Sequence, residues 1–231
     1  MQGTVKETEA TKFNALAGEW WNPRGPMAPL HAMNGARTRW VLERLPQGKP
    51  LQLLDIGCGA GLAAEAFAKA GLAVTGMDAA PDVIDVARRH AAEHGVAVDY
   101  VHGGPEDLAP DARFDVVTAL EVIEHVADKP LFLASLRALL PEGGQLFLST
   151  LNRTRKSLIV AKYGAEYVLR LLPIGTHDWN EFVTPAELSG LLRRAGFTVE
   201  EVSGLGPRFP GGEWRAGGST DVNYLLACRA I

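Results

Sequence analysis

Two groups of residues in the chain have types and spacings that suit chemistry. The first is the stretch DIGCGAG, in which Asp55 is followed by Gly57, Gly59 and Gly61 at alternate positions. Glycine is needed where the backbone turns sharply and approaches a ligand without a Cβ in the way. Asp78 ends the next apolar run, where its carboxylate can accept both hydrogen bonds of a ribose diol. Together they predict a site for a ligand that carries a ribose.

The glycine spacing departs from the dinucleotide-binding pattern G-x-G-x-x-G. The position three residues after Gly59 is Leu62, so the spacing that binds a pyrophosphate is broken. An ordinary strand-to-helix turn, with Asp78 as a capping residue, is the alternative interpretation. The coincidence of Asp55, the alternate glycines and a strand-ending acid favours ligand binding over this alternative.

The second group is Glu121, Glu124 and His125 in the stretch EVIEHV, directly after the fourth apolar run. Two carboxylates and an imidazole within five residues can form a site for a divalent cation, and oxygen ligands suit Mg²⁺. The same residues also suit catalysis without a metal, with His125 as a general base and Glu124 beside it. The sequence leaves both interpretations open.

Strands and helices alternate around these residues. Apolar runs predict strands at 51–56, 73–78, 98–103, 114–120 and 145–151, with helices near 62–70, 81–94 and 130–140 between them. Another helix at 186–197 precedes two further strands, at 198–204 and 222–230, and no tight hairpin is expected in the Gly- and Pro-rich segment between these. Parallel strands need such helical crossovers. The predicted fold is α/β and doubly wound, with a mostly parallel seven-stranded sheet and helices on both faces.

The composition favours one domain over 1–231, with an N-terminal helical extension over 1–45 and a helical insert over 152–182. Of the 231 residues, 47% are hydrophobic, and the net charge of -4 argues against a nucleic-acid partner. Cys58 and Cys228 lack the spacing of a metal finger or a disulfide framework, which favours a reduced, cytoplasmic location. We expect neither a signal peptide nor a spanning helix.

The glycine turn and Asp78 resemble those of class I methyltransferases, in which the turn holds the methionine part of S-adenosylmethionine and the acid holds the ribose. Over nearly the whole chain the sequence resembles the ubiquinone-biosynthesis O-methyltransferases. The resemblance is carried by FNALAGEWWNPRGPMAPLHAMNGAR, DIGCGAG, EVIEHV, STLNRTRKS, GAEYVLRLLPIGTHDWNEFVTPAEL and DVNYLL. It implies methyl transfer to a phenolic hydroxyl of a polyprenylated catechol or demethylubiquinol. A methyltransferase for another small acceptor, and a non-catalytic assembly protein, are the alternatives.

The resemblance also implies roles for individual residues. Arg37 can hold the cofactor's carboxylate through two charge-assisted hydrogen bonds, and Leu120 lies where the adenine is expected. Members of the family are thought to use Mg²⁺ at the positions of Glu121, Glu124 and His125. The expected cofactor-binding residues are Arg37, Asp55, Gly57, Gly59, Asp78, Glu106 and Leu120.

The insert offers a route to a substrate that resides in a bilayer. The stretch KSLIVAKYGAEYVLRLL predicts an apolar helix with a narrow polar stripe, preceded by the basic residues Arg153, Arg155 and Lys156. A basic start and an apolar face suit contact with an anionic lipid surface through residues 153–172. A helix that packs on the sheet or covers the site as a lid is the alternative. We expect a cytoplasmic protein peripherally associated with the inner membrane, with other quinone-biosynthesis proteins as further partners.

Overall fold

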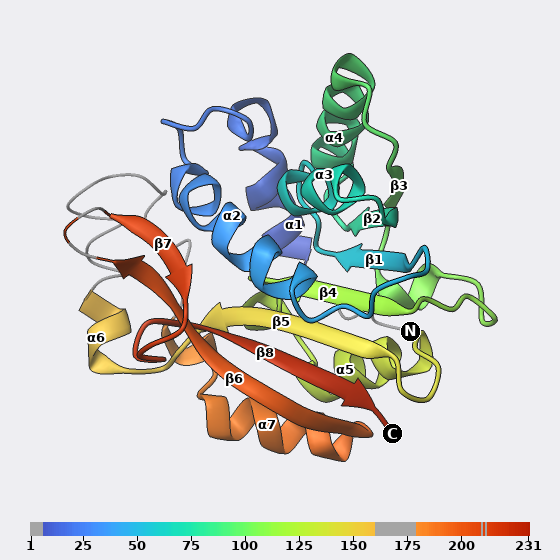
Figure 1. Cartoon of the computed structure of the whole chain (residues 1–231). Helices are drawn as coiled ribbons and strands as arrows, with labels where there is room; N and C mark the ends of the chain where they lie inside the picture. Colours follow the sequence, from blue (N-terminus) through green and yellow to red (C-terminus); the bar gives the residue numbers. More distant parts are fainter. Residues whose placement is uncertain (1–6, 160–178, 209, 211) are drawn as a thin grey trace.

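The structure is a computed structural model that describes residues 7–159, 179–208, 210 and 212–231. The described residues form one eight-stranded sheet with the strand order β3-β2-β1-β4-β5-β8-β6-β7 (Figure 1). Its strands are β1 (Gln52–Ile56), β2 (Ala73–Asp78), β3 (Asp99–His102), β4 (Val116–Leu120), β5 (Gln145–Leu151), β6 (Phe197–Arg208), β7 (Glu213–Ala216) and β8 (Asn223–Ala230). Most of the predicted insert, residues 160–178, lies outside the described residues.

The sheet is mostly parallel and is covered by helices on both faces, which confirms the predicted α/β fold. Strands β1 to β5 pair in parallel, and β8 lies antiparallel between β5 and β6. Helices α2 (Ala28–Leu42), α3 (Leu62–Lys69) and α4 (Pro81–His94) pack on one face, and α5 (Lys129–Ala138) and α7 (Pro185–Arg194) pack on the other. Because a central strand is buried on both faces, Leu53 packs with the first layer of helices and Leu54 with the second.

Local signals in the sequence set the ends of these helices. Pro81 occupies the first turn of α4, and Gly95 ends the helix with a left-handed φ of 63°. Asp128 caps α5 by accepting a 2.9 Å hydrogen bond from the Leu131 N–H. Thr184 and Glu187 form a capping box at the start of α7. The helices predicted at 81–94, 130–140 and 186–197 are present close to their expected bounds.

The sheet has one strand more than the sequence predicted. Strand β6 continues to Arg208 and pairs antiparallel with β7, with Arg208 opposite Glu213, so the expectation of no tight hairpin in this segment is wrong. Trp214 lies opposite Pro207, and charged side chains alternate along the short β7. Charged residues suit an edge strand such as β7, where one row of backbone groups faces solvent. Pro207 lies in the part of β6 beyond Leu205, where the pairing with β8 has ended.

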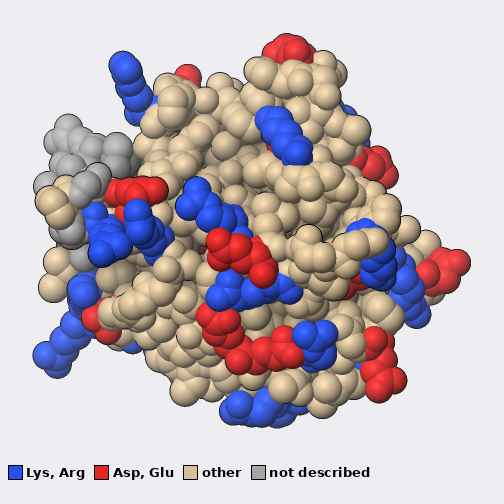
Figure 2. Space-filling view, viewed as in Figure 1, with Lys and Arg blue, Asp and Glu red and all other residues tan. Residues whose placement is uncertain are grey.

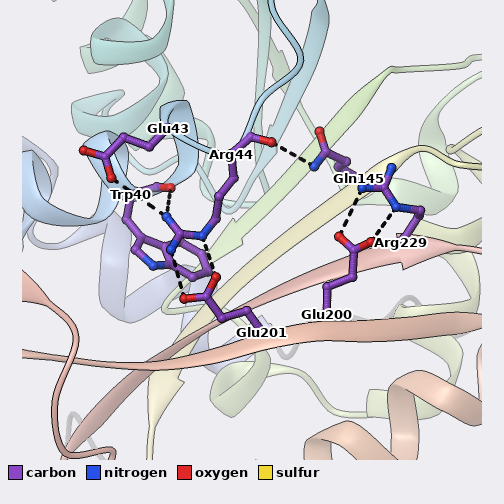
Figure 3. Close-up of polar contacts among 7 residues, drawn as sticks. All are labelled: Trp40, Glu43, Arg44, Gln145, Glu200, Glu201 and Arg229. Carbon is purple, nitrogen blue, oxygen red and sulfur yellow. Dashed lines mark hydrogen bonds and ion pairs between the residues drawn. The ribbon is translucent and has the colours of Figure 1, made fainter.

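The antiparallel half of the sheet is tied to α2 by side chains shown in Figure 3. The Arg44 guanidinium lies 4.0 Å above the Trp40 ring and donates two 2.9 Å hydrogen bonds to the Glu201 carboxylate on β6. The Gln145 side chain on β5 donates to the Arg44 carbonyl at 3.1 Å. These contacts fix α2, which carries Arg37, against the sheet.

The N-terminal segment comprises α1 (Glu7–Asn14), the short helix η1 (Ala17–Glu19) and α2. Trp21 stacks on His90 of α4, with ring centroids 3.4 Å apart, and its indole N–H donates to the Ala60 carbonyl at 3.0 Å. Asn14 accepts a 3.1 Å hydrogen bond from the Asp82 N–H at the start of α4. The segment is therefore held against the helices that follow β1 and β2.

Surface charge and helix length bear on the expected partners. Figure 2 shows basic and acidic side chains interspersed over the face in view, rather than a field of one sign. None of the helices in the described part of the chain is long and apolar enough to cross a membrane.

Candidate active site

A cavity lies where the carboxyl ends of β1, β2 and β4 meet the N-terminal segment. Its empty volume is about 920 Å³, counting the open mouth. In an open α/β sheet, ligands bind beyond the carboxyl ends of the strands. The sequence-predicted residues that line the cavity are Arg37, Gly57, Asp78, Leu120, Glu121 and His125.

The glycine turn forms the wall of the cavity beside β1. Gly57, Gly59 and Gly61 all have left-handed φ values, of 67°, 55° and 95°. A Cβ on Gly59 would lie 2.1 Å from Cζ2 of Trp20, and one on Gly57 would lie 2.4 Å from the Val122 side chain. Glycine is therefore required here both by backbone conformation and by close packing.

Asp78 lies next to the glycine turn, as the ribose-site prediction requires. Its carboxylate accepts 2.9 Å hydrogen bonds from the Gly59 N–H and the Ala80 N–H. Burial raises the pKa of Asp78, and the backbone N–H groups oppose that rise. An ionised carboxylate can accept about four hydrogen bonds, so these two leave capacity for a ribose diol.

Arg37 and Asp55 are buried beside the turn, with polar atoms that have no partner. Arg37 Nε donates to Asn34 at 3.1 Å, and Asp55 Oδ1 accepts a 2.6 Å hydrogen bond from Thr118. Among the described residues, Arg37 Nη1 and Asp55 Oδ2 have no hydrogen-bond partner. Burial lowers the pKa of Arg37 and raises that of Asp55 to about 6. Buried orphan groups are costly, and a ligand with a carboxylate and an ammonium group would satisfy both.

Two further predicted cofactor contacts differ in their placement. Leu120, at the end of β4, lines the cavity and is 6% exposed. Glu106 is exposed in the short helix η2 (Pro105–Asp107), and the cavity is lined there by Gly103, Gly104 and Pro105 instead. A contact between Glu106 and adenine stays a prediction.

The carboxylates of Glu121 and Glu124 point into a polar network at the ends of β4, β5 and β8. Glu121 accepts hydrogen bonds from Ser149 at 2.6 Å and from Asn223 at 3.1 Å. Glu124 is 3% exposed, does not line the cavity, and accepts a 2.8 Å hydrogen bond from Thr150. Burial, and secondly the nearby Glu121, raise the pKa of Glu124 to about 7.

Glu121 also has an unusual backbone. It is the non-glycine residue of the described part with a positive φ, 61°. Such strain persists only where the surroundings hold it, and it is concentrated at functional sites. The kink follows β4 directly and turns the chain into the short helix η3 (Ile123–His125), which presents His125 to the cavity.

His125 contacts two residues of α1. Its Nδ1 lies 2.8 Å from Oε2 of Glu9, and the Phe13 ring packs edge-on against the imidazole with centroids 5.4 Å apart. Burial alone would lower the pKa of His125, but the hydrogen bond to Glu9 and the nearby carboxylates outweigh it, so the pKa is raised. The same hydrogen bond to His125 lowers the pKa of Glu9 to about 2.

Glu121, Glu124 and His125 do not converge on one point. The described residues include no group of three or more His, Cys, Asp or Glu side chains arranged to hold a metal ion. In this arrangement the three residues do not fit a cation, so we derive no catalytic step through one. Metal ligation by Glu121, Glu124 and His125 stays a prediction that requires their side chains to rearrange.

The sequence did not single out Glu9 or Phe13, because a short polar helix near the N-terminus shows nothing of what it covers. Trp20 can serve both as a packing anchor and as part of the cavity wall. It lines the cavity against Gly59 and is also buried, at 5% exposure.

Comparison with known proteins identifies methyltransferases as relatives of this chain. A family model described as a methyltransferase domain matches residues 30–202. The ubiquinone biosynthesis O-methyltransferase of Azorhizobium caulinodans is 47% identical, over 96% of this chain and 93% of that protein. The same-named protein of Xanthomonas axonopodis pv. citri is 46% identical, over 95% and 92%.

Among solved structures, the fold is similar to that of a possible histamine N-methyltransferase of Thermotoga maritima. The TM-score is 0.68 at 18% identity, and the match covers 96% of this chain and 99% of that one. At 18% identity this similarity shows the fold alone. The family is shown by the relatives that are 47% and 46% identical. This chain belongs to the ubiquinone biosynthesis O-methyltransferase family of S-adenosylmethionine-dependent enzymes.

Proposed function

We propose that the chain transfers the methyl group of S-adenosylmethionine to a phenolic hydroxyl of a polyprenylated catechol or demethylubiquinol in ubiquinone biosynthesis. One observation carries the proposal. A single cavity is lined by the orphaned Arg37 and the ribose-binding candidate Asp78, and by the imidazole of His125. The same cavity can therefore hold the methyl donor and bring the acceptor hydroxyl to His125, the proposed proton acceptor.

The cofactor is held in this proposal by four groups. Arg37 Nη1 donates to its carboxylate, and Asp55 Oδ2 accepts from its ammonium group. Asp78 accepts from the ribose hydroxyls, and Leu120 packs against the adenine. The orphaned atoms of Arg37 and Asp55 support the first two roles, and the place of Asp78 beside the glycine turn supports the third.

The chemistry requires an ionised acceptor oxygen. The sulfonium is a strong electrophile, but a free phenol has a pKa of about 10 and is almost entirely protonated at neutral pH. His125 takes the phenolic proton while the oxygen lone pair forms the O–CH₃ bond. The C–S bond breaks, its electron pair stays on sulfur, and His125 later releases the proton to water. Glu124 acts on His125 through its charge, and the cavity aligns the two reactants.

A labelled-cofactor assay tests the proposal. The chain is incubated with methyl-labelled S-adenosylmethionine and either a short-chain prenyl catechol or unsubstituted catechol, and the methylated oxygen is identified by NMR. We expect O-methylation of the prenyl catechol with a higher kcat/KM than that of catechol. Label that appears only on an amine, a carboxylate or an unprenylated phenol would contradict the proposed substrate.

We further propose that the protein meets its lipid-borne substrate at an anionic membrane surface through residues 153–172. The described part of this segment is modestly basic, because Arg153 pairs with Glu187 and Lys156 lies 3.1 Å from Asp221. Arg155 is exposed in α6 (Arg155–Ser157). We expect vesicles rich in phosphatidylglycerol or cardiolipin to carry the protein upward in a flotation gradient. Replacing Arg153, Arg155 and Lys156 with Glu should reduce flotation, and no flotation of the unaltered protein would contradict the proposal.

A further inference from the structure

We propose that Trp21 is a positioning residue for the methyl donor, which holds the glycine turn in its binding conformation without touching the ligand. Its neighbour Trp20 lines the cavity, whereas Trp21 does not. The inference rests on the proposed binding of the cofactor at this turn. It does not depend on which acceptor is methylated.

The turn needs support from outside, because its own backbone has unusual freedom. Gly59 and Gly61 lack a Cβ, so many conformations are open to them in the absence of a ligand. Ala60 lies between them and is fully buried, so its carbonyl requires a hydrogen-bond partner inside the protein. The Trp21 indole N–H donates to that carbonyl at 3.0 Å. This hydrogen bond fixes the peptide that joins Ala60 to Gly61.

Trp21 is itself held by a ring of contacts that leads back to the turn. Its side chain stacks on His90 of α4, with ring centroids 3.4 Å apart and planes 4° from parallel. His90 Nδ1 lies 2.6 Å from Oε1 of Glu65 on α3, whose side chain is 1% exposed. Helix α3 begins at Leu62, directly after the turn. A network of this kind can stabilise more than its contacts would separately.

The placement of Trp21 also bears on Trp20, the preceding residue. The Trp20 carbonyl lies 2.9 Å from Nε2 of His31 on α2, and the His31 ring meets Trp21 edge-on with centroids 6.1 Å apart. The Trp20 side chain packs against Gly59 and lines the cavity. Trp21 therefore connects the glycine turn to the aromatic side chain that lies against it.

A purely structural role for Trp21 makes different predictions. If the indole N–H only fastened the N-terminal segment, its loss would lower the free energy of unfolding and leave the affinity for the cofactor unchanged. If the N–H preorganises the turn, the cofactor must order the turn itself once the N–H is lost, and its affinity falls. The bound state is then the same, so kcat at saturating S-adenosylmethionine should not change.

The first experiment compares Trp21→Phe with the matched control Trp179→Phe. Phenylalanine keeps a ring for stacking and removes the N–H, and the Trp179 N–H donates to the Thr154 carbonyl at 3.0 Å, where neither residue lines the cavity. By calorimetry, we expect Trp21→Phe to raise the Kd for S-adenosylhomocysteine about 5- to 30-fold and Trp179→Phe to leave it unchanged. In Trp21→Phe the KM for S-adenosylmethionine should rise with the Kd, while kcat stays within about twofold. An unchanged Kd in Trp21→Phe, or an equal rise in both variants, would overturn the inference.

The second experiment measures amide hydrogen exchange over residues 55–62. Without ligand, exchange should be faster in Trp21→Phe than in the unaltered protein, because the hydrogen bonds from the Gly59 and Gly61 N–H groups open more often. With saturating S-adenosylhomocysteine the two proteins should exchange at the same rate. Equal exchange without ligand would contradict preorganisation by Trp21.

A third variant, His90→Leu, keeps the Trp21 N–H and removes the ring on which it stacks. Its Kd for S-adenosylhomocysteine should shift in the same direction as that of Trp21→Phe, and an unchanged Kd would count against the ring of contacts. Failure of the inference would leave the proposed function standing, because the unaltered chain would still bind the cofactor. Absence of cofactor binding by the unaltered chain would overturn both.

Discussion

Replacing His125 with alanine is expected to lower kcat about 10²- to 10⁴-fold at neutral pH, the usual contribution of a general base. The affinity for S-adenosylhomocysteine should change little, because the proposed cofactor contacts lie on Arg37, Asp55 and Asp78. The loss should shrink as the pH rises toward the acceptor's own pKa of about 10, where the phenol ionises without help. Steady-state kinetics from pH 6 to 10, with calorimetry at one pH, measure both effects.

His94→Ala is the matched control, because His94 is exposed on α4 and does not line the cavity. Its kinetics should equal those of the unaltered enzyme. A His125→Ala variant that keeps its turnover, or one whose loss is the same at every pH, would contradict the role of His125 as the base.

Replacing Gly59 with alanine is expected to destabilise the chain by about 2–5 kcal/mol and to remove measurable cofactor binding. The left-handed backbone costs a non-glycine residue about 1–2 kcal/mol, and the overpacking against Trp20 adds about 1–3 kcal/mol. Trp20 must move away, and it lines the cavity together with Asp78, whose carboxylate accepts a hydrogen bond from the Gly59 N–H. Chemical denaturation and calorimetry measure the two losses.

Gly95→Ala separates the backbone cost from the steric cost. Gly95 has a φ of 63°, close to the 55° of Gly59, and a Cβ there would meet nothing within 4 Å. This control should lose about 1–2 kcal/mol and bind the cofactor normally. Equal effects of the two substitutions would show that Trp20 does not press on the turn.

The core fold was predictable because its signals are local. Each predicted strand of the parallel half is a short apolar run, and the helices between them start at Pro81 or Asp128 and end near Gly95, where proline, caps and glycine act within one turn. The β6–β7 hairpin was not predictable in the same way. The strand β7 has only four residues, and although Trp214 and Ala216 pack against the core, so short an alternation is a weak signal and the strand depends on its pairing with β6.

The residues of the site also differ in whether local sequence signals predict their positions. Asp55 lies near the end of β1, the glycines follow that strand and Asp78 ends β2, so parallel pairing alone brings them together. The contacts of Glu9 and Trp20 depend on how the N-terminal segment folds back over the cavity, across more than 100 residues in the case of Glu9 and His125. Proximity in the sequence does not decide which way the Glu124 side chain points. Glu124 is one residue from His125, yet it turns away from the cavity toward Thr150.

A crystal structure of the chain with S-adenosylhomocysteine and a catechol tests the central claim most directly. We expect the cofactor carboxylate within hydrogen-bond distance of Arg37, the ribose hydroxyls on Asp78, and a catechol oxygen between the cofactor sulfur and His125 Nε2. A cofactor bound away from the glycine turn, or a catechol whose oxygens face away from His125, would contradict it.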